Sequence, residues 1–157
     1  MAAIKEHTEV EALARFLAVE TLLASVDGYM VNKNNWRLYQ RPQDGKWLFI
    51  AHGMDRVFAE SEMPLFPPTY GRLAHEFFQH PELRQLYLKT LEQLLQKCHR
   101  PEFLEKRIDE LSPRILDLLR ETNPQEMKAF SRSADKLKER LAARRAFLAR
   151  ELAKLRP

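Results

Sequence analysis

Residues 26–58 read VDGYMVNKNNWRLYQRPQDGKWLFIAHGMDRVF, and this stretch decides the fold. Trp36–Tyr39 alternates as a strand does, and Trp47–Ile50 has the composition of a returning strand. The Pro and the Asp-Gly pair within Arg41–Gly45 favour a turn between them. We therefore predict a β-hairpin with an irregular segment on each side. A two-stranded hairpin is not stable alone, so it must lie on neighbouring helices.

Apolar residues at helical spacing predict helices through most of the remaining chain, which makes the fold mainly α with a small β-hairpin, an α+β class. One helix is expected from Glu6 to Ser25, before the hairpin. After a proline-rich loop at Pro64–Pro68, further helices are expected over 70–79, 82–98, 101–122 and from Asn123-Pro124 to about Leu155. Pro113 is expected to kink or break the third of these.

Composition excludes several classes of protein. Hydrophobic residues make up 45% and charged residues 31% of the 157, as in folded globular chains. No apolar run approaches the roughly 18 residues of a membrane span. Met1–Glu11 has no signal-peptide core, so the cytoplasm is the default compartment expected from this chain. The lone Cys98 has no cysteine partner and is expected to be a buried packing residue of its helix.

Positive charge is concentrated at the end of the chain. Residues 127–157 hold ten Lys or Arg against three Asp or Glu, within a net charge of +4 for the whole chain. Five leucines form one apolar stripe there: Leu137, Leu141, Leu148, Leu152 and Leu155. This pattern predicts a helix packed on a bundle with a solvated basic face. A basic-helix module for polyanions or anionic membranes is the alternative, although no nucleic-acid-reading motif accompanies it.

Three oxygen-bearing residues flank the predicted hairpin. Asp27 and Asn32 stand five positions apart before it, and Asp55 follows directly after it. Protein kinases use this D-x-x-x-x-N spacing, followed by a strand pair and a metal-binding Asp. Carboxylate and amide oxygens are the ligands that Mg²⁺ prefers. The spacing alone is equally compatible with Asp27 and Asn32 serving as turn and cap residues.

Residues 26–39 closely resemble the DGY…N…NNYxLY segment of the CotH family. Residues 47–58 resemble that family's next block, written FIPWDxDxxF or FIPHGMDxxF. The resemblance extends over about residues 10–150. It implies the C-terminal lobe of an atypical protein kinase-like fold. It also implies phosphorylation of protein Ser or Thr from ATP with Mg²⁺ or Mn²⁺.

The same resemblance implies roles for individual residues. Asp27 would be the catalytic base, Asn32 a metal ligand and Asp55 the main metal ligand. Asn35 would support the loop by a hydrogen bond to its backbone. His52-Gly53 stands where many members carry Trp-Asp, and His52 is interpreted as a supporting residue and not as a ligand.

The resemblance also implies an arrangement of the whole chain. Residues 1–157 would form one C-lobe domain, with a helix in 1–25, the catalytic loop, hairpin and metal loop in 26–58, and a helical bundle with a basic last helix in 69–157. No Gly-rich loop or strand Lys precedes Asp27, so the nucleotide-binding lobe is expected to be absent and this chain alone to be inactive. A non-catalytic scaffold or remnant of the family is the alternative. Family members are often exported or found in the spore coat.

Overall fold

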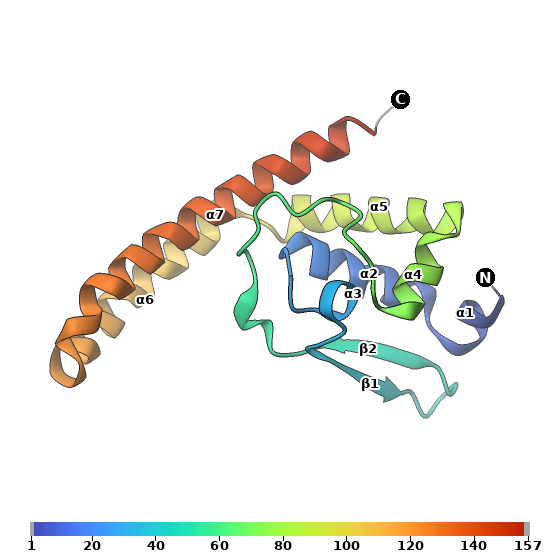
Figure 1. Ribbon diagram of the computed structural model, residues 1–157, viewed down its shortest axis with the longest axis horizontal. Helices are drawn as coiled ribbons and strands as arrows, with labels where there is room; N and C mark the ends of the chain where they lie inside the picture. Colours follow the sequence, from blue (N-terminus) through green and yellow to red (C-terminus); the bar gives the residue numbers. More distant parts are fainter. Residues whose placement is uncertain (1, 156–157) are drawn as a thin grey trace.

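The computed structural model describes residues 2–155 as a mainly helical molecule with one two-stranded antiparallel sheet (Figure 1), which confirms the predicted fold class. In chain order the elements are α1 (Ala2–His7), α2 (Val10–Leu22), α3 (Tyr29–Asn32), β1 (Trp36–Gln40), β2 (Trp47–Ala51), the 3₁₀ turn η1 (Met54–Arg56), α4 (Arg72–Phe78), α5 (Pro81–Lys97), α6 (Pro101–Thr122), the 3₁₀ turn η2 (Pro124–Glu126) and α7 (Met127–Ala153).

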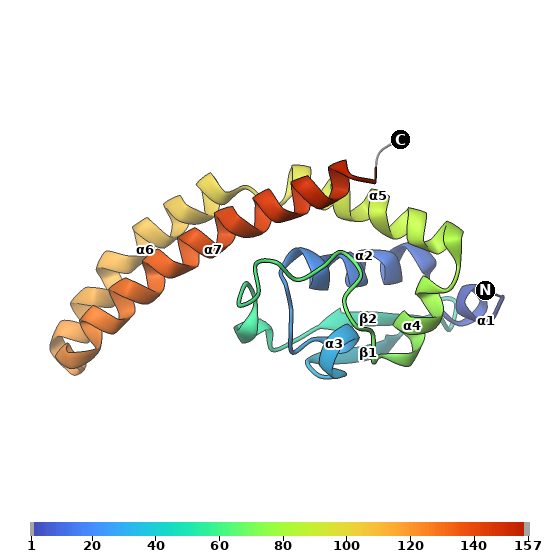
Figure 2. The same cartoon turned by 45° about the horizontal axis from the view of Figure 1, so that its top comes forward.

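Helix α2 is the central element. It packs against α5 on one side and against β2 on the other (Figures 1 and 2). Its apolar residues recur at helical spacing, and Leu13, Phe16 and Leu17 are among those that are buried. The elements that carry the candidate site therefore rest on a helix that is covered on both sides.

The single helix expected from Glu6 to Ser25 is wrong at both ends. The chain leaves the helix at Thr8, whose hydroxyl donates to the Ile4 carbonyl at 2.6 Å and whose backbone forms a bridge with Trp47. A side chain that bonds its own backbone in this way competes with helix continuation. At the other end α2 stops at Leu22, because Ala24 takes a positive φ of 48°.

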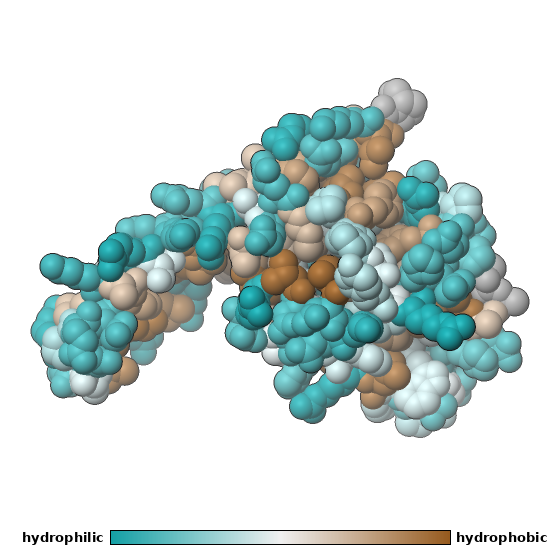
Figure 3. All heavy atoms as spheres, in the orientation of Figure 1, coloured by the Kyte–Doolittle hydropathy of each residue, from teal (hydrophilic) through white to brown (hydrophobic). Residues whose placement is uncertain are grey.

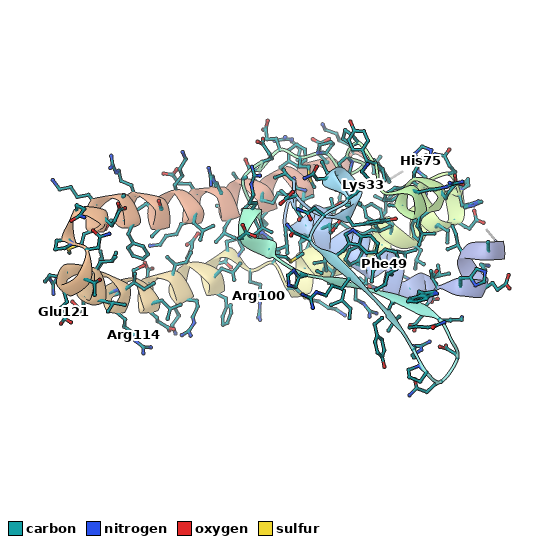
Figure 4. All side chains as sticks on the ribbon, turned by 60° about the horizontal axis from the view of Figure 1, so that its bottom comes forward. Lys33, Phe49, His75, Arg100, Arg114 and Glu121 are labelled. Carbon is teal, nitrogen blue, oxygen red and sulfur yellow. The ribbon has the colours of Figure 1, made fainter. Side chains whose placement is uncertain are left out.

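The hairpin forms as predicted, with Trp36 opposite Ala51 and Gln40 opposite Trp47. It is held to the helices by aromatic rings. Phe49 lies 5.4 Å from Phe16 and stacks on Trp36 at 5.3 Å, measured between ring centroids. Figure 4 labels Phe49 where the hairpin meets the helices. Trp47, at the start of β2, is 38% exposed and lies outside the buried core.

The later helices have nearly the predicted bounds, with two corrections. Helix α6 runs on through Pro113, so the expected break does not occur. Both Pro113 and Asp109, whose carbonyl loses its helical donor, are exposed, so water can satisfy that carbonyl. Cys98 is exposed at the end of α5 and is not a packing residue, because the helix ends there with its side chain outside the core.

Helices α6 and α7 run side by side and project from the rest of the molecule, while the C-terminal half of α7 returns along α5 (Figures 1 and 2). Arg114 and Glu121 lie towards the distal end of this helical pair and Arg100 at its base (Figure 4). The buried residues of α7 are Leu141, Arg144, Leu148 and Leu152, which confirms most of the predicted leucine stripe. None of the described helices is long and apolar enough to span a membrane.

Candidate functional site

Asp27 lies at the centre of a cluster of amide side chains. Its Oδ1 accepts a hydrogen bond from the Asn32 amide at 2.5 Å, and its Oδ2 accepts from the Asn35 amide at 3.0 Å and the Asn34 amide at 3.4 Å. These side chains, which are close in sequence, also meet in space because the short helix α3 folds the chain back on itself. The structure thus joins two of the three predicted site residues, Asp27 and Asn32, by a direct contact.

The surroundings of Asp27 favour its ionised form. The hydrogen bond from Asn32, then that from Asn34, and the positive charge of Arg56 lower the pKa of the Asp27 carboxyl below its usual value. A carboxylate offers about four acceptor sites, so three amide donors leave about one for another partner. At neutral pH the cluster therefore presents one negative charge with little spare acceptor capacity.

Asp55 lies in η1 and is exposed. Among the residues that the structure describes, its side chain makes no hydrogen bond or ion pair. The positive charge of its neighbour Arg56 contributes to the lowered pKa of Asp27. Because no direct contact joins Asp55 to Asp27 or Asn32, their convergence on one metal ion stays a prediction.

Asn35 and the segment after β2 connect the two loops. The Asn35 carbonyl accepts the backbone N–H of His52 at 2.9 Å, in addition to the side-chain bond to Asp27. Gly53 has a φ of 57°, and a Cβ there would lie only 2.6 Å from the Asn35 Oδ1. Glycine is therefore required at 53 both for its backbone conformation and for this close approach.

His52 is exposed and turned towards Arg37, whose guanidinium lies 3.2 Å from its Nε2. Arginine has donors only, so in this contact Nε2 of His52 is the acceptor. This contact occupies one of the two ring nitrogens, and the supporting role of His52 stays a prediction.

The loop of Asp27 depends on a residue that the sequence reasoning missed. Glu20 is 1% exposed, and its two carboxylate oxygens accept the backbone N–H groups of Tyr29 at 2.7 Å and Met30 at 2.9 Å. Burial raises the pKa of Glu20, while these two hydrogen bonds act in the opposite direction. The signal was present in the sequence, since Glu20 falls four residues after Phe16 on the apolar face of α2.

The buried carboxylate of Glu20 leaves no room for a side chain at residue 28, which is therefore glycine. A Cβ at 28 would lie 2.5 Å from the Glu20 Oε1 and 2.9 Å from the Ser25 hydroxyl. No real Cβ approaches an oxygen so closely, so only glycine allows the chain to pass over Glu20. The residue next to Asp27 is thereby held against α2.

Strained backbone gathers in the same region. Within residues 2–155 the non-glycine residues with positive φ are Ala24, Lys33, Asn35 and Phe58. Each costs about 1–3 kcal/mol and persists only where surrounding contacts impose it, as happens at functional sites. All four belong to the segments that lead into or out of the two loops.

The donor set suits a hard divalent cation. Asp55 offers an unpaired carboxylate, and Asn32 offers the amide oxygen that its bond to Asp27 leaves unused. Mg²⁺ is bound in proteins by one or two carboxylates with water and phosphate oxygens completing its shell. No group of three His, Cys, Asp or Glu side chains gathers anywhere in the described residues, so a site built wholly from protein carboxylates is not present there.

A comparison with models of protein families finds a match over most of the chain. The family model described as CotH kinase protein matches residues 1–148. The matched range includes both loops, the hairpin and the helices beneath them. A comparison with curated proteins finds no match. Because the family model covers nearly the whole chain, this chain belongs to the CotH kinase protein family.

Proposed function

We propose that this chain carries the metal-binding and proton-accepting half of a phosphoryl-transfer site, which acts from ATP onto Ser or Thr of a protein. The observation that supports the proposal best is the Asp27–Asn32 contact of 2.5 Å, in a loop that belongs to a kinase family. In this proposal Asp27 orients the acceptor hydroxyl and takes its proton. Asn32 and Asp55 hold Mg²⁺ or Mn²⁺.

The lowered pKa of Asp27 is compatible with this role. A carboxylate that stays ionised is a weak base, but phosphoryl transfer needs mainly positioning of the acceptor hydroxyl and stabilisation of charge. The remaining acceptor site of Asp27 suits one hydroxyl donor. When bound, the metal ion would neutralise negative charge on the phosphate oxygens.

Nucleotide binding is expected to need further elements. The four glycines of the chain are widely separated, so no Gly-rich loop is available to cover phosphates. We propose that a nucleotide-binding lobe supplies this grip and that the present chain alone transfers no phosphate. Transfer depends on holding the phosphoryl group in line with its acceptor.

A non-catalytic scaffold is the second candidate. It is favoured by Asp55, which makes no contact with Asp27 or Asn32 among the described residues. A basic-helix module is supported less, because two arginines of the basic segment, Arg144 and Arg145, are engaged with backbone carbonyls inside the molecule.

The test is incorporation of labelled phosphate from ATP into a Ser-rich protein acceptor. The chain is assayed alone and fused to the nucleotide-binding lobe of a CotH relative, each with Asp27→Ala as the control. Activity of the fusion that disappears in Asp27→Ala supports the proposal. A correctly folded fusion that binds ATP but transfers nothing would favour the scaffold.

A further inference from the structure

Arg144 is a fully buried cation without an acidic partner. It is 0% exposed, and no carboxylate pairs with it in residues 2–155. Its guanidinium donates instead to four backbone carbonyls, those of Thr21 at 2.5 Å, Met63 at 2.5 Å, Ser61 at 3.0 Å and Leu22 at 3.4 Å. Burial lowers its pKa to about 10, so it remains charged at neutral pH.

These carbonyls belong to two segments that flank the candidate site. Thr21 and Leu22 end α2, directly before the loop of Asp27. Ser61 and Met63 follow the loop of Asp55. One guanidinium, supplied by α7 from far along the chain, thus binds both segments at once. The carbonyl end of α2 carries partial negative charge, which favours a cation there.

Two other contacts join the same pair of segments. The Phe58 N–H donates to the Leu23 carbonyl at 2.7 Å. The Tyr87 hydroxyl, fully buried on α5, bonds the Leu65 carbonyl at 2.5 Å and the Thr21 hydroxyl at 2.8 Å. Figure 3 shows hydrophobic surface where α7 meets the body, and the side chains of Arg144 and Tyr87 are themselves fully buried.

Arg145, the next residue of α7, provides a contrast. Its guanidinium donates to the carbonyls of Leu95, at 2.6 Å, and His99. Both lie at the end of α5, outside the two segments that flank the site. Two adjacent arginines therefore fasten the same helix, but only one of them binds the backbone on either side of the loops.

We propose that Arg144 is a positioning residue for the Asp27–Asp55 site, and that the docking of α7 through Arg144 sets how tightly the site binds a divalent metal. This inference rests on the proposed function, because it assumes that Asn32 and Asp55 share a metal ion. Without the guanidinium the two segments would lose the four hydrogen bonds that they share through Arg144. The contacts of Phe58 and Tyr87 would remain, so the loop of Asp55 would be held less firmly against the end of α2.

The experiment measures Mn²⁺ binding to the full chain by calorimetry, for the wild type and for Arg144→Lys, Arg145→Lys and Asp55→Asn, well below the melting temperature of each. Residues that orient metal ligands typically change metal affinity about 10- to 100-fold, and we expect Arg144→Lys to fall in that range. Arg145→Lys should stay within about twofold of the wild type, since an arginine outside the site has no such effect. Equal affinity of the folded Arg144→Lys chain and the wild type would overturn the inference.

A second measurement separates this inference from the proposed function. Hydrogen exchange at the Phe58 amide reports whether the two segments stay joined, with or without metal. We expect Arg144→Lys to lose protection there and Arg145→Lys to keep it. Wild type that binds no Mn²⁺ would overturn the proposed metal site, while the exchange data still decide whether Arg144 holds the loops. If Arg144→Lys does not fold, Tyr87→Phe is used instead, because it removes a hydroxyl that bonds the same two segments. We expect Tyr87→Phe to weaken both Mn²⁺ binding and the protection of the Phe58 amide. No change in either would overturn the inference.

Discussion

At the scale of single residues, buried charge is concentrated on Glu20 and Arg144. Each is at most 1% exposed, and neither forms an ion pair with a described residue. Backbone groups of the loops take the place of a counter-ion, since Glu20 accepts two N–H groups and Arg144 donates to four carbonyls. Removing either side chain would leave buried backbone groups without partners, which is more costly than losing a surface bond.

Glu20→Ala should destabilise the chain strongly. It removes both acceptors of the Tyr29 and Met30 N–H groups and leaves a cavity beneath Gly28. An unsatisfied buried donor costs about 1–3 kcal/mol, so a loss of about 2–4 kcal/mol in free energy of unfolding is expected. Glu20→Gln keeps one acceptor and should lose less. Denaturant melts measure the effect, with the exposed Glu11→Ala as the control within about 0.5 kcal/mol.

The buried His99 should lower the free energy of unfolding of the chain at acidic pH. It is 2% exposed, its two ring nitrogens have no hydrogen-bond partner in the described residues, and its ring contacts Phe58. Burial, followed by the positive charges of Arg145 and Arg144, lowers its pKa below the ordinary 6.5, while the backbone of His99 itself and then Glu102 act in the opposite sense. The unfolded chain therefore binds a proton at His99 that the folded chain does not bind. The free energy of unfolding decreases as the pH falls from 6.5 towards the lowered pKa.

This pH dependence is measured by denaturant melts between about pH 7 and about pH 5, the range in which histidine titrates. His99→Phe keeps the ring contact and removes the titrating group, so its free energy of unfolding should fall less over this range. The exposed His75→Ala should retain the slope of the wild type. Parallel curves for the wild type and His99→Phe would contradict the prediction, because they would show that the pKa of His99 is the same in the folded and unfolded chains.

At the scale of elements, α7 has two different halves. Its buried residues all lie from Leu141 onwards, where it meets the body, whereas its first half packs against α6. Helix α6 itself has only Pro101 buried among its described residues. The projecting part of the pair is therefore held by partly exposed contacts, and the docked half of α7 supplies most of the attachment.

Leu148→Ala should show how much the docked half of α7 contributes to the free energy of unfolding. Leu148 is 0% exposed, and deleting a buried leucine side chain costs about 2–5 kcal/mol. Leu155 belongs to the same predicted stripe but is 54% exposed, so Leu155→Ala should change the free energy of unfolding by no more than about 0.5 kcal/mol. Thermal and denaturant melts of both variants test the assignment. Similar costs for the two would mean that the end of α7 is docked more closely than its exposure indicates.

At the scale of the whole molecule, the site lies between elements contributed by most of the chain. The loops rest on α2, the hairpin connects them, and α5 and α7 fasten their flanks. A ligand that binds the folded state alone should stabilise the whole cooperative unit and not only the loops.

Mg²⁺ or Mn²⁺ should therefore raise the melting temperature of the chain. At about 100 times its dissociation constant a ligand adds about 2.7 kcal/mol, which corresponds to a rise on the order of 5 °C for a chain of this length. Asp55→Asn should abolish the rise, and the exposed Asp135→Asn should leave it intact. A rise that survives in Asp55→Asn would place the ion elsewhere.

The elements themselves were predictable from local sequence. The turn residues at Arg41–Gly45 determine the hairpin, and the apolar spacing determines α5, α6 and α7 within a few residues. Likewise, the spacing of Asp27 and Asn32 brings their side chains together within one short loop. In each case the interacting groups are close in sequence, so the chain has few ways to arrange them.

Only the tertiary structure determined the contacts between distant segments. The bridge from Thr8 to Trp47 divides the first predicted helix, and the carbonyls around Arg144 turn one member of a basic segment into a core residue. Arg144 looks like a surface charge in the sequence, because charged side chains are rarely buried. Glu20 lies on the apolar face of its helix, but the sequence does not show which groups it would contact there. The burial of both residues became favourable only when folding placed unpaired backbone donors and acceptors beside them, and no local pattern records where such groups will lie.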